Sequence, residues 1–143
     1  VPSPTPSRSH AAPAPALDPP RGTGGMRAAV AGHESLIRAR ACDSIRPDAP
    51  RVGGITQFLR LMTFADQAGL DLAPHFAMEI HLHLAATYPR EPWVEHFDWL
   101  DPLFEERLET RDGRMIVPDR PGLGITFTDQ ARAWTTEKVT ITA

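Results

Sequence analysis

The middle of the sequence alternates between short apolar runs and longer helical patterns. Short strands are expected at Ser44 to Arg46 and at Asp71 to Ala73. Helices are expected over residues 53–70 and about 77–87, each after one of these strands and the second ended by a proline. Strands that alternate with helices in this way are typical of parallel α/β units, in which each helix connects two neighbouring strands.

The helix expected over residues 53–70 has the clearest periodicity in the chain. Gly69 is expected to end it. Apolar residues that recur at i, i+3, i+4, i+7 and i+10 define its expected buried face: Ile55, Phe58, Leu59, Met62 and Ala65. An earlier helix is expected over residues 29–41, after a glycine-rich turn at residues 21–25. Its apolar side carries Val30, Leu36, Ile37 and Ala41.

The last third of the sequence has a different pattern. Two short strands, Arg107 to Thr110 and Met115 to Val117, flank the turn signal R-D-G-R and predict a hairpin. A closing helix is expected over residues 128–134, with Thr128 as its N-cap. We therefore expect three regions: an irregular or disordered segment over 1–22, α/β units over 23–100, and a hairpin and helix over 101–143.

The irregular segment is expected because the first twenty residues hold seven of the chain's fifteen prolines. Proline lacks a backbone donor and disfavours both helices and sheet ladders. The 143 residues can form one domain with a hydrophobic core, but a closed (β/α)₈ barrel typically needs about 250 residues. The units therefore predict either an incomplete doubly wound sheet or an incomplete barrel.

Charge and cysteine content exclude several function classes. The formal net charge is −3, which provides no basic field for nucleic acid or an anionic membrane surface. No apolar run approaches the roughly 18 residues of a membrane span, and no signal-peptide pattern is visible. The single Cys42 excludes an intrachain disulfide framework. We therefore expect an unexported, cytoplasmic protein.

The segment Leu72 to Ala86 reads L-A-P-H-F-A-M-E-I-H-L-H-L-A-A and contains three histidines and a glutamate. On a helix, Glu79 and His83 would be neighbours, while His81 would point elsewhere. The spacing does not match a zinc motif, so polar decoration of a helix is favoured over a zinc site. His75 differs, because it follows an expected strand at the end where α/β folds place their functional groups.

Two carboxylates occupy comparable positions. Asp48 follows the strand expected at Ser44 to Arg46, and Glu95 lies in the apolar segment P-W-V-E-H-F. These two residues and His75 all have ordinary alternatives. Asp48 could cap a turn or a helix, Glu95 could be an exposed acid, and His75 could be structural. A sharper hypothesis is that the three side chains, at the ends of consecutive elements, converge on one cavity.

The motifs around these residues resemble the C-terminal half of the mandelate-racemase branch of the enolase superfamily. The stretches are R-P-D-A-P-R-V-G-G-I-T, A-P-H-F-A-M-E and W-V-E-H-F-D-W, and the order and spacing of Asp48, His75 and Glu95 match the family. The further stretches G-R-M-I-V-P-D-R-P-G-L-G and Q-A-R-A-W-T are most similar to acid-sugar dehydratases of the galactarate/talarate type.

This resemblance implies part of a (β/α)₇β barrel, with Mg²⁺ at the barrel mouth and a sugar acid as substrate. The metal would bind the substrate carboxylate and stabilise the enediolate formed on loss of the α-proton. By resemblance, His75 is the general acid/base, Asp48 orients its ring, Glu95 hydrogen-bonds the substrate carboxylate, and Arg51 contacts the substrate.

The chain departs from the family at Gly25, which stands where the third acidic metal ligand is found in a Gly-Glu pair. The other metal ligands and the lysine base of the family would precede Val1. Three interpretations stay open: a catalytically incomplete dehydratase fragment, a non-catalytic half-barrel that folds with a partner chain, and a lyase completed by another polypeptide. A racemase or epimerase of the same family is a further alternative. The unpaired strand edges of a half-barrel predict an oligomer or a partner chain.

Overall fold

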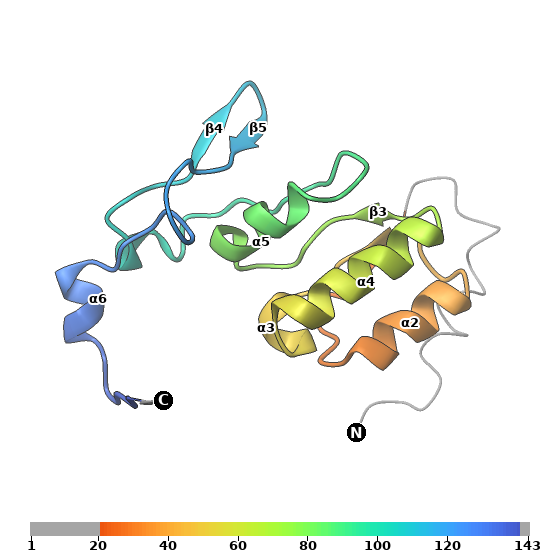
Figure 1. Ribbon diagram of the computed structural model, residues 1–143, viewed down its shortest axis with the longest axis horizontal. Coiled ribbons are helices and arrows are strands. Elements are labelled where there is room, and N and C mark those ends of the chain that lie inside the picture. Colours follow the sequence, from red (N-terminus) through yellow and green to blue (C-terminus); the bar gives the residue numbers. More distant parts are fainter. Residues whose placement is uncertain (1–20, 141–143) are drawn as a thin grey trace. The chain divides into compact units, whose positions relative to one another are not determined.

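The computed structural model describes residues 21–140, and the chain divides into two compact units, one ending at His96 and the other beginning at Phe97. All of the strand–helix units lie in the first unit (Figure 1). The irregular segment expected over residues 1–22 lies outside the described residues except for Arg21 and Gly22. No described helix is both long enough and apolar enough to cross a membrane.

The first unit is built on a three-stranded parallel sheet. Its strands are β1 (Gly22–Thr23), β2 (Ser44–Ile45) and β3 (Asp71–Leu72), in the order β1-β2-β3. Ser44 pairs with Gly22 on one side and with Asp71 on the other. The turn expected at residues 21–25 is therefore wrong in its first part, because this glycine-rich stretch begins with a sheet strand. Strands β2 and β3 confirm the two strands expected at Ser44 to Arg46 and at Asp71 to Ala73.

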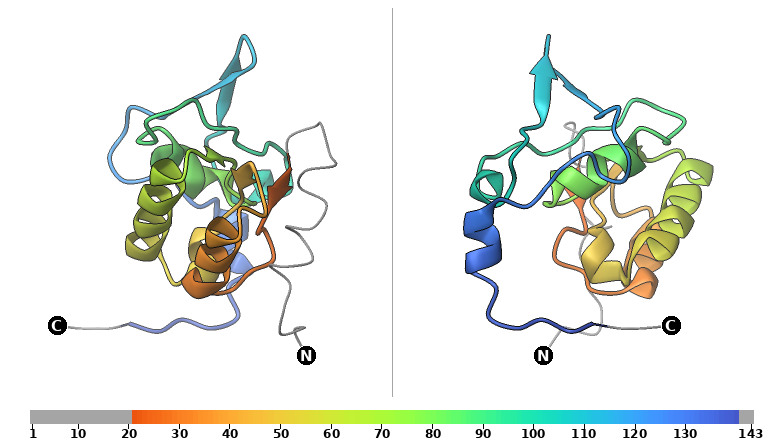
Figure 2. Two further views of the ribbon diagram at one scale, coloured as in Figure 1. Left: turned by 90° about the vertical axis from the view of Figure 1, so that its right-hand side faces the viewer. Right: turned by 60° about the vertical axis from the view of Figure 1, so that its left-hand side comes forward.

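Helices α2 (Val30–Arg38) and α4 (Ile55–Gln67) connect successive strands and lie side by side (Figures 1 and 2). Ile45 and Leu72 of the sheet are fully buried against α4. The main core contains these buried residues: Ile45, Ala49, Val52, Phe58, Leu61, Met62, Ala65, Leu72, Leu84 and Tyr88. Full burial of an aliphatic or aromatic side chain contributes about 1.5–3 kcal/mol, so this cluster supplies the main driving force for folding of the unit.

The buried face of α4 differs from the predicted one at three positions. Ile55 is 53% exposed and Leu59 is 41% exposed, whereas Leu61 is fully buried. An additional short helix, α3 (Ala49–Val52), precedes α4 and packs against it. Gly53 and Gly54 both have positive φ angles, and this backbone conformation lets two helices follow one another at a sharp angle.

Helix α5 (Met78–Ala85) follows β3, as expected, and six of its eight residues are buried: Met78, Glu79, His81, Leu82, Leu84 and Ala85. It begins after two residues in the left-handed region, Phe76 (φ 59°) and Ala77 (φ 37°). Neither residue is a glycine, so this turn is held in a conformation that costs roughly 1–3 kcal/mol for each such residue.

The second unit contains a short 3₁₀ helix η2 (Asp101–Leu103), the hairpin strands β4 (Glu109–Arg111) and β5 (Arg114–Ile116), and helix α6 (Asp129–Ala133). The predicted hairpin is confirmed, with strand bounds shifted by one or two residues. Its turn residues Asp112 and Gly113 both have positive φ, as a two-residue type I′ turn requires. Thr128 caps α6 as predicted, accepting a hydrogen bond from the Ala131 amide at 3.0 Å.

Candidate active site

The parallel ladder between β2 and β3 continues past the assigned strands and brings Asp48 and His75 together. The Ala73 amide donates to the Ile45 carbonyl at 3.0 Å, and the His75 amide donates to the Pro47 carbonyl, also at 3.0 Å. Both side chains therefore follow the carboxyl ends of neighbouring parallel strands, the edge where α/β folds place their ligands. The convergence expected from the sequence is observed for this pair.

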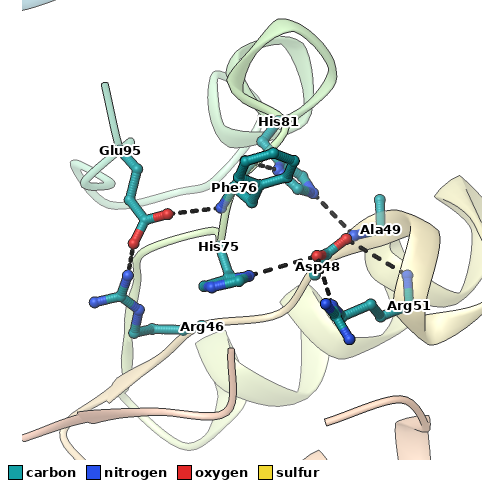
Figure 3. A network of polar contacts seen from close by, with 8 residues as sticks. All are labelled: Arg46, Asp48, Ala49, Arg51, His75, Phe76, His81 and Glu95. Carbon is teal, nitrogen blue, oxygen red and sulfur yellow. Dashed lines mark hydrogen bonds and ion pairs between the residues drawn. The ribbon is translucent and has the colours of Figure 1, made fainter. Parts of the chain in front are cut away.

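Asp48 has three contacts and is 4% exposed. Its Oδ2 atom lies 3.4 Å from Nδ1 of His75 and 3.2 Å from Nε of Arg51 (Figure 3). Its Oδ1 atom accepts a hydrogen bond from the Arg51 amide at 3.4 Å and so caps the N-terminus of α3. The capping interpretation and the catalytic interpretation of Asp48 are therefore compatible, because each uses a different oxygen of one carboxylate.

His75 is oriented by this contact. A carboxylate can only accept hydrogen bonds, so pairing with Asp48 requires the imidazole proton to sit on Nδ1. The neutral ring then has an unprotonated Nε2 that can accept a proton. The side chain of His75 is 26% exposed, so this nitrogen belongs to a partly accessible ring. The arrangement is that of a general acid/base with an orienting carboxylate.

Glu95 lies on the other side of His75 (Figure 3). Its Oε2 atom accepts a hydrogen bond from the Phe76 amide at 2.7 Å, and its Oε1 atom forms an ion pair with Arg46. With its side chain 27% exposed, Glu95 is neither the exposed acid of the ordinary alternative nor a free group facing a cavity. Both of its oxygens are engaged by this chain's own donors. Arg46, at the end of β2, was not among the residues selected from the sequence.

His81 differs from the polar decoration of a helix that the sequence favoured. It is fully buried on α5, and its ring stacks on Phe58 of α4 with the centroids 5.3 Å apart. Its Nδ1 lies 2.6 Å from the Phe76 carbonyl oxygen, and its Nε2 accepts from the Ala49 amide at 2.8 Å. Burial lowers the pKa of His81 from its ordinary value of 6.5, which favours the neutral ring at neutral pH.

Gly25 lies against the ring of His75. A Cβ atom built on Gly25 would be 2.6 Å from Cδ2 of His75, closer than non-bonded carbon atoms approach, and a tight 3.2 Å from Nε2. At this position the chain offers neither a carboxylate ligand nor space for one with His75 in its present place. No cluster of three or more His, Cys, Asp or Glu side chains suited to a metal ion occurs within residues 21–140. The described residues therefore do not fit a Mg²⁺ site.

The family pattern described as Enolase C-terminal domain-like matches residues 9–131. The chain belongs to this family. The enolase C-terminal domain is a (β/α)₇β barrel, and the three parallel strands with their connecting helices form part of one. The fold and the family expected from the sequence motifs are confirmed.

Similar proteins of the enolase C-terminal domain-like family include sugar-acid dehydratases. L-talarate/galactarate dehydratase of Salmonella typhimurium LT2 is 60% identical over 126 residues, which are 88% of this chain and 32% of the relative. Arabinonate dehydratase of Saccharolobus solfataricus is 34% identical over 118 residues, covering 70% of this chain and 31% of the relative. The chain thus spans about a third of the length of these curated relatives.

A solved structure of L-talarate dehydratase from Polaromonas sp. JS666, complexed with Mg and L-glucarate, aligns with a TM-score of 0.89 and 62% identity. The alignment covers 92% of this chain and 37% of that chain. The L-talarate/galactarate dehydratase of Salmonella typhimurium LT2, with Mg and L-lyxarohydroxamate, aligns with a TM-score of 0.87 at 58% identity, over 90% of this chain and 33% of that one. Relatives of this chain therefore bind Mg and sugar-acid ligands.

Proposed function

We propose that this chain carries the histidine acid/base part of an acid-sugar dehydratase site. The observation that supports this best is the 3.4 Å contact between Asp48 Oδ2 and His75 Nδ1 at the carboxyl ends of two parallel strands. The similarity to dehydratases that bind L-glucarate supports a sugar acid as the substrate class. Because the chain spans only about a third of such proteins, we assign to it this part of the reaction alone.

In this proposal His75 exchanges a proton with the substrate through Nε2. When it accepts the proton, positive charge develops on the ring, and the negative charge of Asp48 stabilises it. When the ring returns the proton to a β-hydroxyl group, that group can leave as water. A positioned acid/base of this kind contributes typically 10²–10⁴-fold to a rate, so the dyad alone does not account for a dehydratase.

Arg51 and Glu95 receive different assignments in the proposal. Arg51 uses Nε to pair with Asp48 and is 42% exposed in its side chain, which leaves the other guanidinium nitrogens for a substrate carboxylate. Glu95 holds the Phe76 amide and Arg46. We assign it the task of fixing the backbone next to His75. Its expected hydrogen bond to the substrate carboxylate would require release from Arg46 and a protonated Glu95 carboxyl group, because two carboxylates can only accept.

Mg²⁺ has no assigned step in this chain, because the described residues do not provide its ligands. In the family the ion supplies charge stabilisation of the enediolate. We expect the chain alone to form no 2-keto-3-deoxy product from galactarate or L-talarate in millimolar Mg²⁺. A product that disappears in His75→Asn would overturn this expectation and support the alternative of an active lyase.

A chimera tests the acid/base assignment directly. Residues 21–140 would replace the matching segment of the Salmonella typhimurium dehydratase, with and without Gly25→Glu. The expected result is dehydration only with Gly25→Glu, abolished by adding His75→Asn; the His75 ring can rotate away from the new side chain because only ring atoms obstruct it. A folded, Mg²⁺-binding Gly25→Glu chimera without activity would refute the assignment. Epimerised substrate instead of keto acid would favour the racemase alternative.

A non-catalytic half-barrel that associates with a partner is the second candidate. Among residues 21–140, β1 pairs with β2 alone, so the outer edge of the sheet at β1 offers unpaired backbone groups. At the β3 edge, the Trp93 amide donates to the Leu72 carbonyl at 2.9 Å. The exposed apolar side chains of Ile55 and Leu59 point to the same need for cover. We propose that the purified chain is an oligomer; a compact monomer by light scattering would contradict this. A cytoplasmic location also belongs to the proposal, and cell fractionation tests it.

A further inference from the structure

His81 connects the two backbone segments that carry the acid/base pair. The Ala49 amide, which it accepts from, directly follows Asp48. The Phe76 carbonyl, which lies 2.6 Å from its Nδ1, directly follows His75. Figure 3 shows the His81 ring between these two backbone groups, on the far side of Phe76 from Glu95. One buried side chain on α5 therefore bridges the ends of β2 and β3.

Only one form of the His81 ring satisfies both contacts. A carbonyl oxygen accepts, so Nδ1 must carry a proton, and an amide N–H donates, so Nε2 must carry none. A doubly protonated ring would direct an N–H of Nε2 against the N–H of Ala49. Loss of either bond also leaves a buried polar group without its partner, which is destabilising.

The strained turn after His75 depends on the same bridge. Phe76 and Ala77 have positive φ angles, and Phe76 is held by Glu95 at its amide and by His81 at its carbonyl. A non-glycine residue stays in the left-handed region only when its surroundings hold it there. Removal of His81 would therefore release the turn that sets the direction of the His75 side chain.

We propose that neutral His81 is a positioning residue that holds Asp48 and His75 in register for proton transfer. The inference deepens the proposed function, since the pair it positions is the proposed acid/base. The ionisable groups that influence His81 are Asp48, whose negative charge favours the protonated ring, and His75, whose positive charge opposes it. Phe58 of α4 covers one face of the ring and carries no charge.

The test measures the Asp48–His75 hydrogen bond by NMR in the full chain with ¹⁵N-labelled histidine. The observable is the exchange rate of the His75 Nδ1 proton with water. Four variants isolate the bridge. His81→Phe keeps a ring stacked on Phe58 but removes both hydrogen bonds. His81→Gln keeps a donor and an acceptor on a long side chain, and His81→Asn carries the same amide on a shorter one. His83→Phe is the matched control on the same helix.

We expect exchange of the His75 Nδ1 proton to accelerate by about tenfold in His81→Phe. This is the factor expected when its single hydrogen bond to Asp48 is lost. His81→Asn should show the same acceleration, and His81→Gln and His83→Phe should remain near the wild type. If His81→Phe fails to fold, the comparison of His81→Gln with His81→Asn decides the test. An unchanged rate in His81→Asn, or an equal acceleration in both amide variants, would overturn the proposal.

A general loss of stability is separated from positioning by Leu61→Ala, which removes a fully buried side chain of the hydrophobic core. At equal loss of melting temperature, Leu61→Ala should leave the His75 proton protected; equal acceleration would assign His81 a structural role alone. The measurement uses no substrate. An inactive Gly25→Glu chimera with a protected, His81-dependent proton would reject the proposed function and leave the bridge standing.

Discussion

The edge of the His75 imidazole occupies the space where Gly25 would carry a Cβ atom. The distance from that Cβ position to His75 Cδ2 would be 2.6 Å. Residue 25 and the acid/base candidate are therefore sterically coupled: any side chain at position 25 has to move the ring, and the Asp48 contact depends on where the ring lies. Gly25 therefore explains two features together: position 25 has no metal-binding side chain, and the His75 ring occupies the space beside it.

Gly25→Ala should therefore displace the His75 ring. We expect the NMR chemical shifts of the ring to change while Nδ1 stays paired with Asp48, and the chain to be destabilised by roughly 1 kcal/mol, at the low end for an added methyl group because a side chain can rotate away. Histidine NMR and urea unfolding measure the two effects. Gly22→Ala is the matched control, since its nearest atom would be at an ordinary 3.4 Å. Unchanged chemical shifts of the His75 ring in Gly25→Ala would contradict the coupling.

Asp48 should show its two tasks separately in two substitutions. Asp48→Asn keeps an oxygen that can accept from the Arg51 amide, whereas Asp48→Ala removes the cap of α3. We expect Asp48→Ala to be less stable than Asp48→Asn by about 1 kcal/mol, the usual contribution of an N-cap. Urea unfolding measures the difference. In an active chimera, both variants should lose most activity, because neither retains the carboxylate that pairs with His75.

The protein should become less stable as the pH falls below neutrality. Burial lowers the pKa of His33 and of His81 from 6.5, so between the lowered values and 6.5 the unfolded chain binds more protons than the folded one. Stability is then fully present above pH 6.5 and decreases on acidification. Melting temperatures between pH 7.5 and 5 measure this. His81→Gln should show a shallower decrease, and a pH-independent wild type would contradict the prediction.

Tyr88, the only tyrosine of the chain, should ionise later in the folded state. Burial raises the pKa of its phenol above the ordinary value of 10.0, and its hydroxyl donates to the Leu70 carbonyl at 2.5 Å. The unfolded chain therefore loses this proton first, so the stabilisation is present below pH 10 and is lost as the pH rises through the folded-state pKa. Phenolate absorbance, titrated with and without urea, measures the shift; coinciding curves would exclude it.

The main elements of the fold could be predicted because each has a local signal. Thr128 before an apolar pattern predicted the capped helix α6, and D-G between two short runs predicted the hairpin. The buried face of α4 was harder to predict. Ile55 and Leu59 have the right spacing for burial, yet both are exposed. Burial depends on which other helices and strands pack against the helix, and not on the helical period alone.

The candidate site was partly predictable for the same reason. Asp48 and His75 follow strands, and the parallel sheet joins strand ends. The roles of Arg46 and His81 gave no such signal. Arg46 pairs with Glu95, a residue distant in sequence, and His81 contacts backbone groups, which look the same at every position in a sequence. A histidine on the apolar side of a helix was the one available hint.

The two units differ in how far apart along the chain their paired strands lie. The hairpin β4–β5 joins neighbours such as Arg111 and Arg114, while the ladder of the first unit pairs Gly22 with Ser44 and Ser44 with Asp71. Closing long loops before any pairing is gained slows folding, whereas hairpins form in about 1–10 μs. The hairpin should therefore form well before the sheet, and the acid/base pair, which exists only once β2 and β3 are aligned, should be among the last features to assemble.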